Sequence, residues 1–176
     1  MNELNFSPVR LARRTLELYL ARGETPELPD TDKKAGAFVS LKTAESEELK
    51  GCIGTIEPSE DNVAEEIAKN AISAATKDPR FPSLKRDELD KIKISVDILG
   101  EKEPVKDLSR LDPEKYGVIV ERGERRGVLL PDLEEVDTAR RQLEIACRKA
   151  GIGPGELESS ETTIFRFPVV RYEEEG

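Results

Sequence analysis

Leu49-Lys50-Gly51-Cys52-Ile53-Gly54-Thr55 is a short apolar stretch in a chain that is otherwise dense with charge. Alternation predicts a strand in which Cys52 and Gly54 share one face while Gly51 and Ile53 share the other. A glycine in a strand gives up side-chain packing and backbone order, so two glycines around a cysteine indicate that another group comes close to the backbone. Two interpretations are open: a tight crossing around a small buried thiol, or a functional site.

The composition limits the chemistry that the chain can perform. Its 176 residues include no histidine, which excludes a Ser-His or Cys-His catalytic pair and a histidine-ligated metal. Any chemistry must use Cys, Asp, Glu, Lys, Arg or Tyr. The two cysteines, Cys52 and Cys147, have neither the number nor the spacing of a metal site. We therefore expect no metal and no cofactor.

The net charge and the hydropathy of the sequence limit the classes of partner that we expect. The formal net charge of -9 disfavours nucleic-acid binding, which needs a basic face. No stretch resembles a signal peptide, and no apolar run approaches the ~20 residues that span a bilayer. We expect a soluble cytoplasmic protein whose partner is a protein or a small molecule, with no membrane contact.

The rest of the chain predicts an α+β fold. Ser7, Ser59 and Asp132 are the predicted caps of three helices, and Gly151 ends the third. Further strands are predicted at 36–42, 92–99, 116–121, 126–130 and 162–172, with a hairpin at 122–125. Residues 173–175 are predicted to form a solvated acidic tail.

Two breaks divide the chain into predicted lobes. Residues 101–112 are polar and contain Pro104, and residues 153–155 read Gly-Pro-Gly. They enclose a smaller lobe, 104–154, inserted into a larger lobe formed by 1–103 and 155–176, which contains both termini. We expect an antiparallel sheet with flanking helices in each lobe, and a cleft between them that opens and closes.

Cys52 is the candidate nucleophile, but a free thiol with a pKa near ~8.5 is mostly protonated at neutral pH. Without histidine, the thiolate needs a cation. Lys50 shares the strand face of Cys52, and the backbone of Arg80 is fixed by prolines on both sides. A preset guanidinium holds carboxylate or phosphate in fork geometry. A structural interpretation stays open for both: Lys50 extends into solvent, and Arg80 pairs with Asp78 and locks the turn.

Two acidic residues are weaker candidates for a general base. Glu57 follows the Cys52 strand, and Asp97 lies on the polar face of the 92–99 strand. Each is also consistent with an ordinary surface charge.

Residues 49–54 resemble the Leu-Arg-Gly-Cys-Ile-Gly hallmark of the AMMECR domain family, with Lys50 in place of arginine. The resemblance continues through 78–82, 117–123 and 127–131 and covers nearly the whole chain. It implies two lobes with the hallmark facing the cleft. The implied substrate contacts are Leu49, Lys50, Gly51, Ile53, Gly54 and Arg80. Lysine keeps the charge at position 50 but removes the bidentate fork.

The resemblance brings no established activity. Similar domains occur beside or fused to Memo-type and radical-SAM proteins, which makes such proteins candidate partners by association. Two functions stay open. In the first, the cleft binds a sizeable substrate and Cys52 acts as a nucleophile in a modification reaction. In the second, the chain is a non-catalytic binding or regulatory module that acts through protein-protein contacts.

Overall fold

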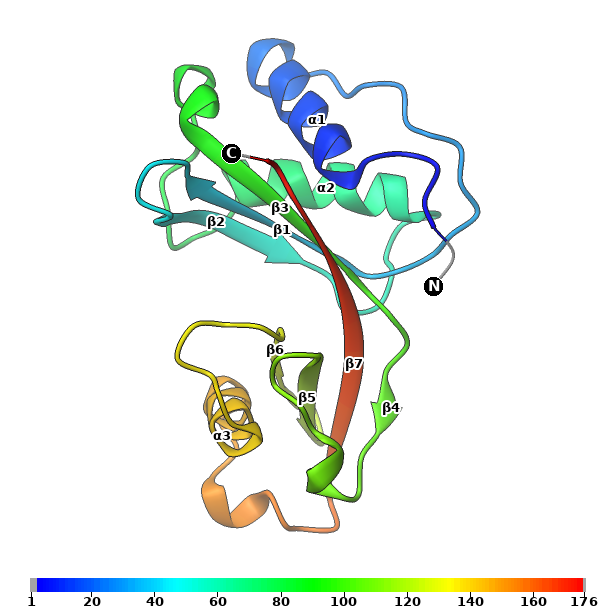
Figure 1. The fold of residues 1–176 in the computed structure, drawn as a ribbon, viewed down its shortest axis with the longest axis vertical. Helices are drawn as coiled ribbons and strands as arrows, with labels where there is room; N and C mark the ends of the chain where they lie inside the picture. Colours follow the sequence, from blue (N-terminus) through cyan, green and yellow to red (C-terminus); the bar gives the residue numbers. More distant parts are fainter. Residues whose placement is uncertain (1–2, 176) are drawn as a thin grey trace. The chain divides into compact units, whose positions relative to one another are not determined.

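The computed structural model describes residues 3–175 and has an α+β fold, which confirms the predicted fold class (Figure 1). The chain forms two compact units, one of Met1–Leu99 with Val170–Gly176 and one of Gly100–Val169. The predicted smaller lobe, 104–154, lies inside the second unit, and its limits stay a prediction. Among the described residues, no helix combines the length and apolarity needed to cross a bilayer.

The first unit is an antiparallel sheet with helices on one face (Figure 1). Its strands β1 (Ala37–Thr43), β2 (Leu49–Gly54) and β3 (Ile92–Leu99) lie in the order β2-β1-β3, and the end of β7 (Thr162–Glu173) follows β3. Helices α1 (Pro8–Arg22) and α2 (Val63–Thr76) pack against the alternate apolar residues of β1 and β3. The other side chains of these strands therefore lie on a face that neither helix covers. We call it the helix-free face.

Helix α1 begins at its predicted cap and α3 (Ala139–Ala150) ends at the predicted Gly151, but the predicted starts of α2 and α3 are wrong. Ser7 accepts from the Arg10 N–H at the start of α1. The predicted cap Ser59 is wrong, because Asn62 Oδ1 accepts the first free N–H groups of α2 at 3.0 Å. The predicted cap Asp132 is also wrong: its φ of 55° is left-handed, and Thr138 caps α3 instead.

The second unit contains β4 (Glu103–Pro104), β5 (Tyr116–Arg122), β6 (Arg125–Leu129) and the first part of β7. These strands form an antiparallel sheet in the order β4-β7-β5-β6, with α3 packed on β5 and β6. The hairpin between β5 and β6 confirms the prediction, with Gly123 in the left-handed region at φ 59°. Short 3-10 helices complete the chain: η1 (Arg86–Lys91), η2 (Leu108–Arg110) and η3 (Pro154–Glu156).

The acidic tail is not wholly solvated, which corrects the prediction for Glu174. Arg13 of α1 donates to both carboxylate oxygens of Glu174, from Nε at 2.8 Å and from Nη2 at 2.6 Å. The Ile94 N–H donates to Glu174 Oε2 at 2.8 Å, and the Glu174 N–H donates to the Ile94 carbonyl. The last residues of β7 are therefore anchored on β3 and α1 in the first unit.

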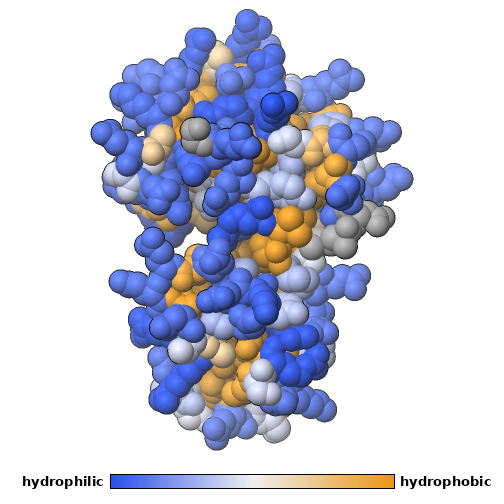
Figure 2. All heavy atoms as spheres, viewed as in Figure 1, coloured by the Kyte–Doolittle hydropathy of each residue, from blue (hydrophilic) through white to orange (hydrophobic). Residues whose placement is uncertain are grey.

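On the face drawn in Figure 2, hydrophilic side chains dominate, with smaller apolar areas between them. The charged residues make up 37% of the sequence, which explains this appearance.

Candidate functional site

Cys52 lies on the helix-free face of the first unit, in a row of small polar side chains. The strand register places Ser40 of β1 opposite both Cys52 of β2 and Ser95 of β3. The Ser40 hydroxyl donates to Cys52 Sγ at 3.2 Å. Sequence reasoning missed Ser40 and Ser95. The register that selects Ser40 depends on a bulge beyond Leu41, which the alternation of residues does not indicate.

The Cys52 thiol is held in its neutral form. Burial raises its pKa above the ordinary value, and the nearby Asp97 and Asp78 charges act in the same direction. The Ser40 hydrogen bond and the Arg80 charge oppose this rise without cancelling it. The thiol is therefore mostly protonated at neutral pH, and the structure supplies no preformed thiolate for a nucleophilic step.

Both glycines beside Cys52 are explained by packing inside the first unit. A Cβ at Gly51 would overlap the carbonyl oxygen of Ala74, so α2 crosses β2 at backbone distance. A Cβ at Gly54 would overlap the ring of Phe38 on β1. The space beside each glycine is therefore occupied by this chain's own atoms, as in a tight crossing.

The predicted rigid turn at 78–82 covers the outer edge of β2. Asp78 Oδ2 accepts from the Cys52 N–H at 3.0 Å, and Arg80 Nη2 donates to the Cys52 carbonyl at 3.3 Å. These main-chain groups point away from β1 on the edge strand, where unpaired groups invite pairing with another chain. Side chains of the turn thus take the place of a further strand at Cys52.

Arg80 is tied to Asp78, in agreement with the structural interpretation of its role. Its Nε and Nη2 donate to the Asp78 carboxylate at 3.0 and 2.8 Å, so the fork that could hold a ligand anion is occupied. These hydrogen bonds, with those from the N–H groups of Cys52 and Arg80, hold the pKa of Asp78 far below its ordinary value. The Arg80 side chain is nevertheless 57% exposed, so its outer side faces solvent.

The remaining residues of the predicted site lie in environments that differ from one another. Lys50 shares the face of Cys52, and its Nζ lies 3.2 Å from a Glu48 carboxylate oxygen. Leu49 is half-buried at the start of β2, and Ile53 packs against the core of the first unit. Glu57 is exposed after the end of β2.

Asp97 is buried and paired. Arg171 of β7 donates to its two carboxylate oxygens, from Nε at 2.7 Å and from Nη2 at 3.1 Å. Both oxygens of the Asp97 carboxylate are therefore occupied by the Arg171 guanidinium in a two-point ion pair. Sequence reasoning missed Arg171, which lies 74 positions from Asp97.

A buried carboxylate shapes the segment that leaves β2. Glu66 of α2 is fully buried, and it accepts hydrogen bonds from Thr55, from the N–H and hydroxyl groups of Ser59, and from the Glu60 N–H. Burial by itself would raise the pKa of Glu66, but these donors outweigh it and the pKa lies below its ordinary value. Glu66 therefore fixes the 55–60 segment directly after the Cys52 strand.

The family model described as AMMECR1 matches residues 9–172. This chain belongs to the AMMECR1 family. The match spans both compact units, so it includes the Cys52 strand and the turn at 78–82.

Relatives of this AMMECR1 chain occur in bacteria and archaea. A protein of Thermotoga maritima is 50% identical over 171 residues, covering 93% of this chain and 95% of the relative. A Clostridium acetobutylicum protein is 49% identical, and the match covers 94% of this chain but only 36% of that longer protein. The crystal structure of uncharacterized protein PH0010 from Pyrococcus horikoshii has a TM-score of 0.88 and 33% identity, over 96% of this chain and 90% of that one.

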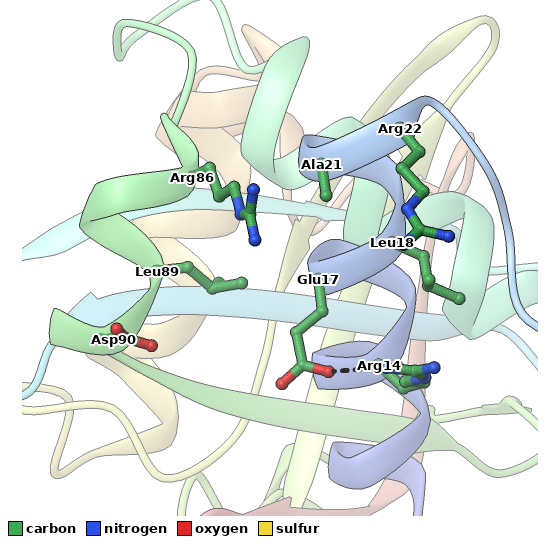
Figure 3. A pocket seen from close by; sticks show the side chains of 8 residues that line it. All are labelled: Arg14, Glu17, Leu18, Ala21, Arg22, Arg86, Leu89 and Asp90. Atoms are coloured by element: carbon green, nitrogen blue, oxygen red, sulfur yellow. Dashed lines mark hydrogen bonds and ion pairs between the residues drawn. The ribbon is translucent and has the colours of Figure 1, made fainter.

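A surface hollow of the AMMECR1 chain lies between α1 and η1, with a volume of about 490 Å³ (Figure 3). Arg86 and Leu89 of η1 point toward Glu17 and Ala21 of α1. None of the predicted site residues lines it. Within residues 3–175, no group of three or more cysteine and acidic side chains is placed to hold a metal ion.

Proposed function

We propose that the helix-free face around Cys52 is a ligand-binding surface, and that Cys52 contacts the ligand as a neutral thiol. The observation that carries this proposal is the Ser40 hydrogen bond to a thiol whose pKa is raised by burial. Cys52, Ser40 and Ser95 are half-buried and adjacent, which gives a ligand polar contacts on a rigid sheet. The predicted cleft and the Memo-type or radical-SAM partners stay predictions.

Covalent catalysis by Cys52 is the second candidate. The Ser40 hydroxyl and the Arg80 charge both favour the thiolate, which supports this role. The thiol must still lose its proton to a base before sulfur can attack, and Asp97 is held by Arg171. A catalytic role therefore requires another base, either Glu57 or a group of the substrate or of a partner.

Alkylation kinetics separate the two candidates. Iodoacetamide is added to the folded protein at several pH values, and mass spectrometry follows Cys52 and Cys147 separately. We expect Cys52 to react more slowly at pH 7 than free cysteine, with a midpoint above the ordinary cysteine pKa. Buried Cys147 is the internal control for unfolding. A Cys52 rate above that of free cysteine would contradict the neutral-contact proposal and favour the nucleophile.

Ligand capture tests the binding surface itself. Metabolites and peptides are recovered on the wild-type protein and on the Ser40→Ala/Cys52→Ser variant, with Ser83→Ala/Cys147→Ala as the matched control. We expect at least one ligand to be lost with the first variant only. Equal recovery of every ligand on all three proteins would show that the Cys52 face does not bind these ligands.

A further inference from the structure

We propose that the helix-free face binds the phosphate group of a small molecule through Lys42 of β1 and Lys93 of β3. This inference rests on the proposed binding function of the same face and names its ligand class. The two lysines lie directly opposite each other in the register of β1 and β3.

The lysine pair is adjacent to the row that contains Cys52. In a strand, residues two positions apart share a face, so Lys42 lies on the face of Ser40 and Lys93 on that of Ser95. Two residues of strand correspond to about 7 Å. A ligand of modest size on the lysines would therefore reach the Ser40 hydroxyl and the Cys52 thiol.

A directly opposed lysine pair is unfavourable for the sheet by itself, because like charges across two strands repel. The chain has 37 acidic residues against 28 basic ones, so partners for cations are plentiful. Lys50, Lys69, Lys102 and Lys115 all have carboxylate partners. In the part of the chain that the structure describes, neither Lys42 nor Lys93 has one within 4 Å. A pair of like charges that opposes sheet pairing in this way is typical of functional positions.

Neighbouring charges define where the anion would lie. The register shift after Leu41 leaves Lys50 as the extra residue of β2 opposite Lys42, so a third cation is close, although Glu48 pairs with it. Lys93 also lines a hollow of about 680 Å³, whose other charged residues are Arg10, Arg13, Glu173, Glu174 and Glu175. Arg13 pairs with Glu174 there, and the three carboxylates outnumber the two guanidinium groups, which favours a phosphate position toward Lys42 and the Cys52 row.

The chemistry of the side chains favours phosphate. Lysine is a compact charge with three donors and binds phosphate as a point charge. The Ser95 hydroxyl lies two residues from Lys93 on the same face and can donate to a phosphate oxygen.

Pyrophosphate is the test probe. Its affinity is measured by calorimetry at low ionic strength for the wild type, for Lys42→Gln/Lys93→Gln, and for Lys34→Gln/Lys77→Gln, which removes the same charge from exposed positions elsewhere in the unit. We expect the Lys42/Lys93 variant to lose affinity by about tenfold or more, while the control retains it. Glu173→Gln is expected to bind more tightly than wild type.

The melting temperature without ligand gives an independent readout. Relief of the repulsion predicts an unchanged or higher Tm for Lys42→Gln/Lys93→Gln, so lost binding cannot be attributed to unfolding. Equal affinity in both double variants, or no pyrophosphate binding by the wild type, would overturn the proposal. If ligands that depend on Ser40 and Cys52 are still captured in that case, only the phosphate assignment fails. If none is captured, the binding function fails with it.

Discussion

At the scale of single residues, buried carboxylates organise the surroundings of Cys52. Glu66 fixes the segment after β2, and Asp78 covers the edge of β2 at Cys52 itself. A buried charge is tolerated only when donors surround it, and both residues meet this condition. Helix α2 and the 78–82 turn therefore both hold the main chain around the Cys52 thiol.

Glu66→Gln is expected to destabilise the protein by about 1.5–3 kcal/mol. The two oxygens of Glu66 accept four hydrogen bonds, and an amide has one accepting oxygen, so some of these donors lose their acceptor. Urea unfolding measures the change, with exposed Glu45→Gln as the control. A difference within about 0.5 kcal/mol of wild type would show that the segment does not depend on the charge.

Acid should weaken the fold through Asp78 and Glu66. The folded-state pKa of each lies below its ordinary value, 3.8 for Asp and 4.5 for Glu, so the unfolded chain binds protons first. Their stabilisation is therefore complete above these values and is lost as pH falls through the folded pKa. Unfolding free energies from pH 6 to pH 3 should fall more steeply for wild type than for Asp78→Asn. Equal slopes for the two proteins would show that Asp78 does not contribute to the loss of stability in acid.

At the scale of elements, the crossing of α2 over β2 determines which residue types fit around Cys52. The would-be Cβ at Gly51 meets main-chain atoms of Ala74, which cannot rotate away. The edge of the same strand is covered by the Asp78 and Arg80 side chains. Residues 49–54 and the turn at 78–82, which are separate in the sequence, therefore pack together along β2.

Gly51→Ala is expected to lower stability by about 1–3 kcal/mol, because α2 must move away from β2 to admit the methyl group. Gly155→Ala is the control, since a Cβ there meets open space. Thermal and urea unfolding of both variants give the comparison. A Gly51 variant as stable as the Gly155 variant would show that the crossing relaxes easily.

At the scale of the whole molecule, β7 belongs to both compact units and ends in the first. The Arg13–Glu174 ion pair anchors that end, with side chains that are 23% and 21% exposed. The hydrogen bonds to Glu174 raise the pKa of Arg13, so Arg13 stays a cation at neutral pH. The C-terminal residues therefore stabilise the first unit although they are last in the chain.

Glu174→Ala is expected to cost about 1–3 kcal/mol of stability, because it removes charge-assisted hydrogen bonds from Arg13 and Ile94. Exposed Glu173→Ala is the matched control for charge. A double-mutant cycle with Arg13→Ala isolates the pair, and additive losses would show that the two side chains do not interact energetically.

The sequence by itself determined the α+β class, the family, the alternating strands, the β5–β6 hairpin, the start of α1 and the end of α3. These features depend on local dihedral preferences and on periodicity, which neighbouring residues specify. The caps of α2 and α3 were missed because Ser59 and Asp132 have suitable side chains, while the buried Glu66 and a left-handed backbone assign them other roles.

Only the tertiary structure decided what surrounds Cys52. Ser40 reaches the thiol through strand register, and Arg171 reaches Asp97 across 74 positions. Arg13 and Glu174 are 161 positions apart. Such pairs depend on topology and on the bulge in β2, and no local pattern encodes them, because many carboxylates and guanidinium groups in this chain are equally able to pair until the strands are in place.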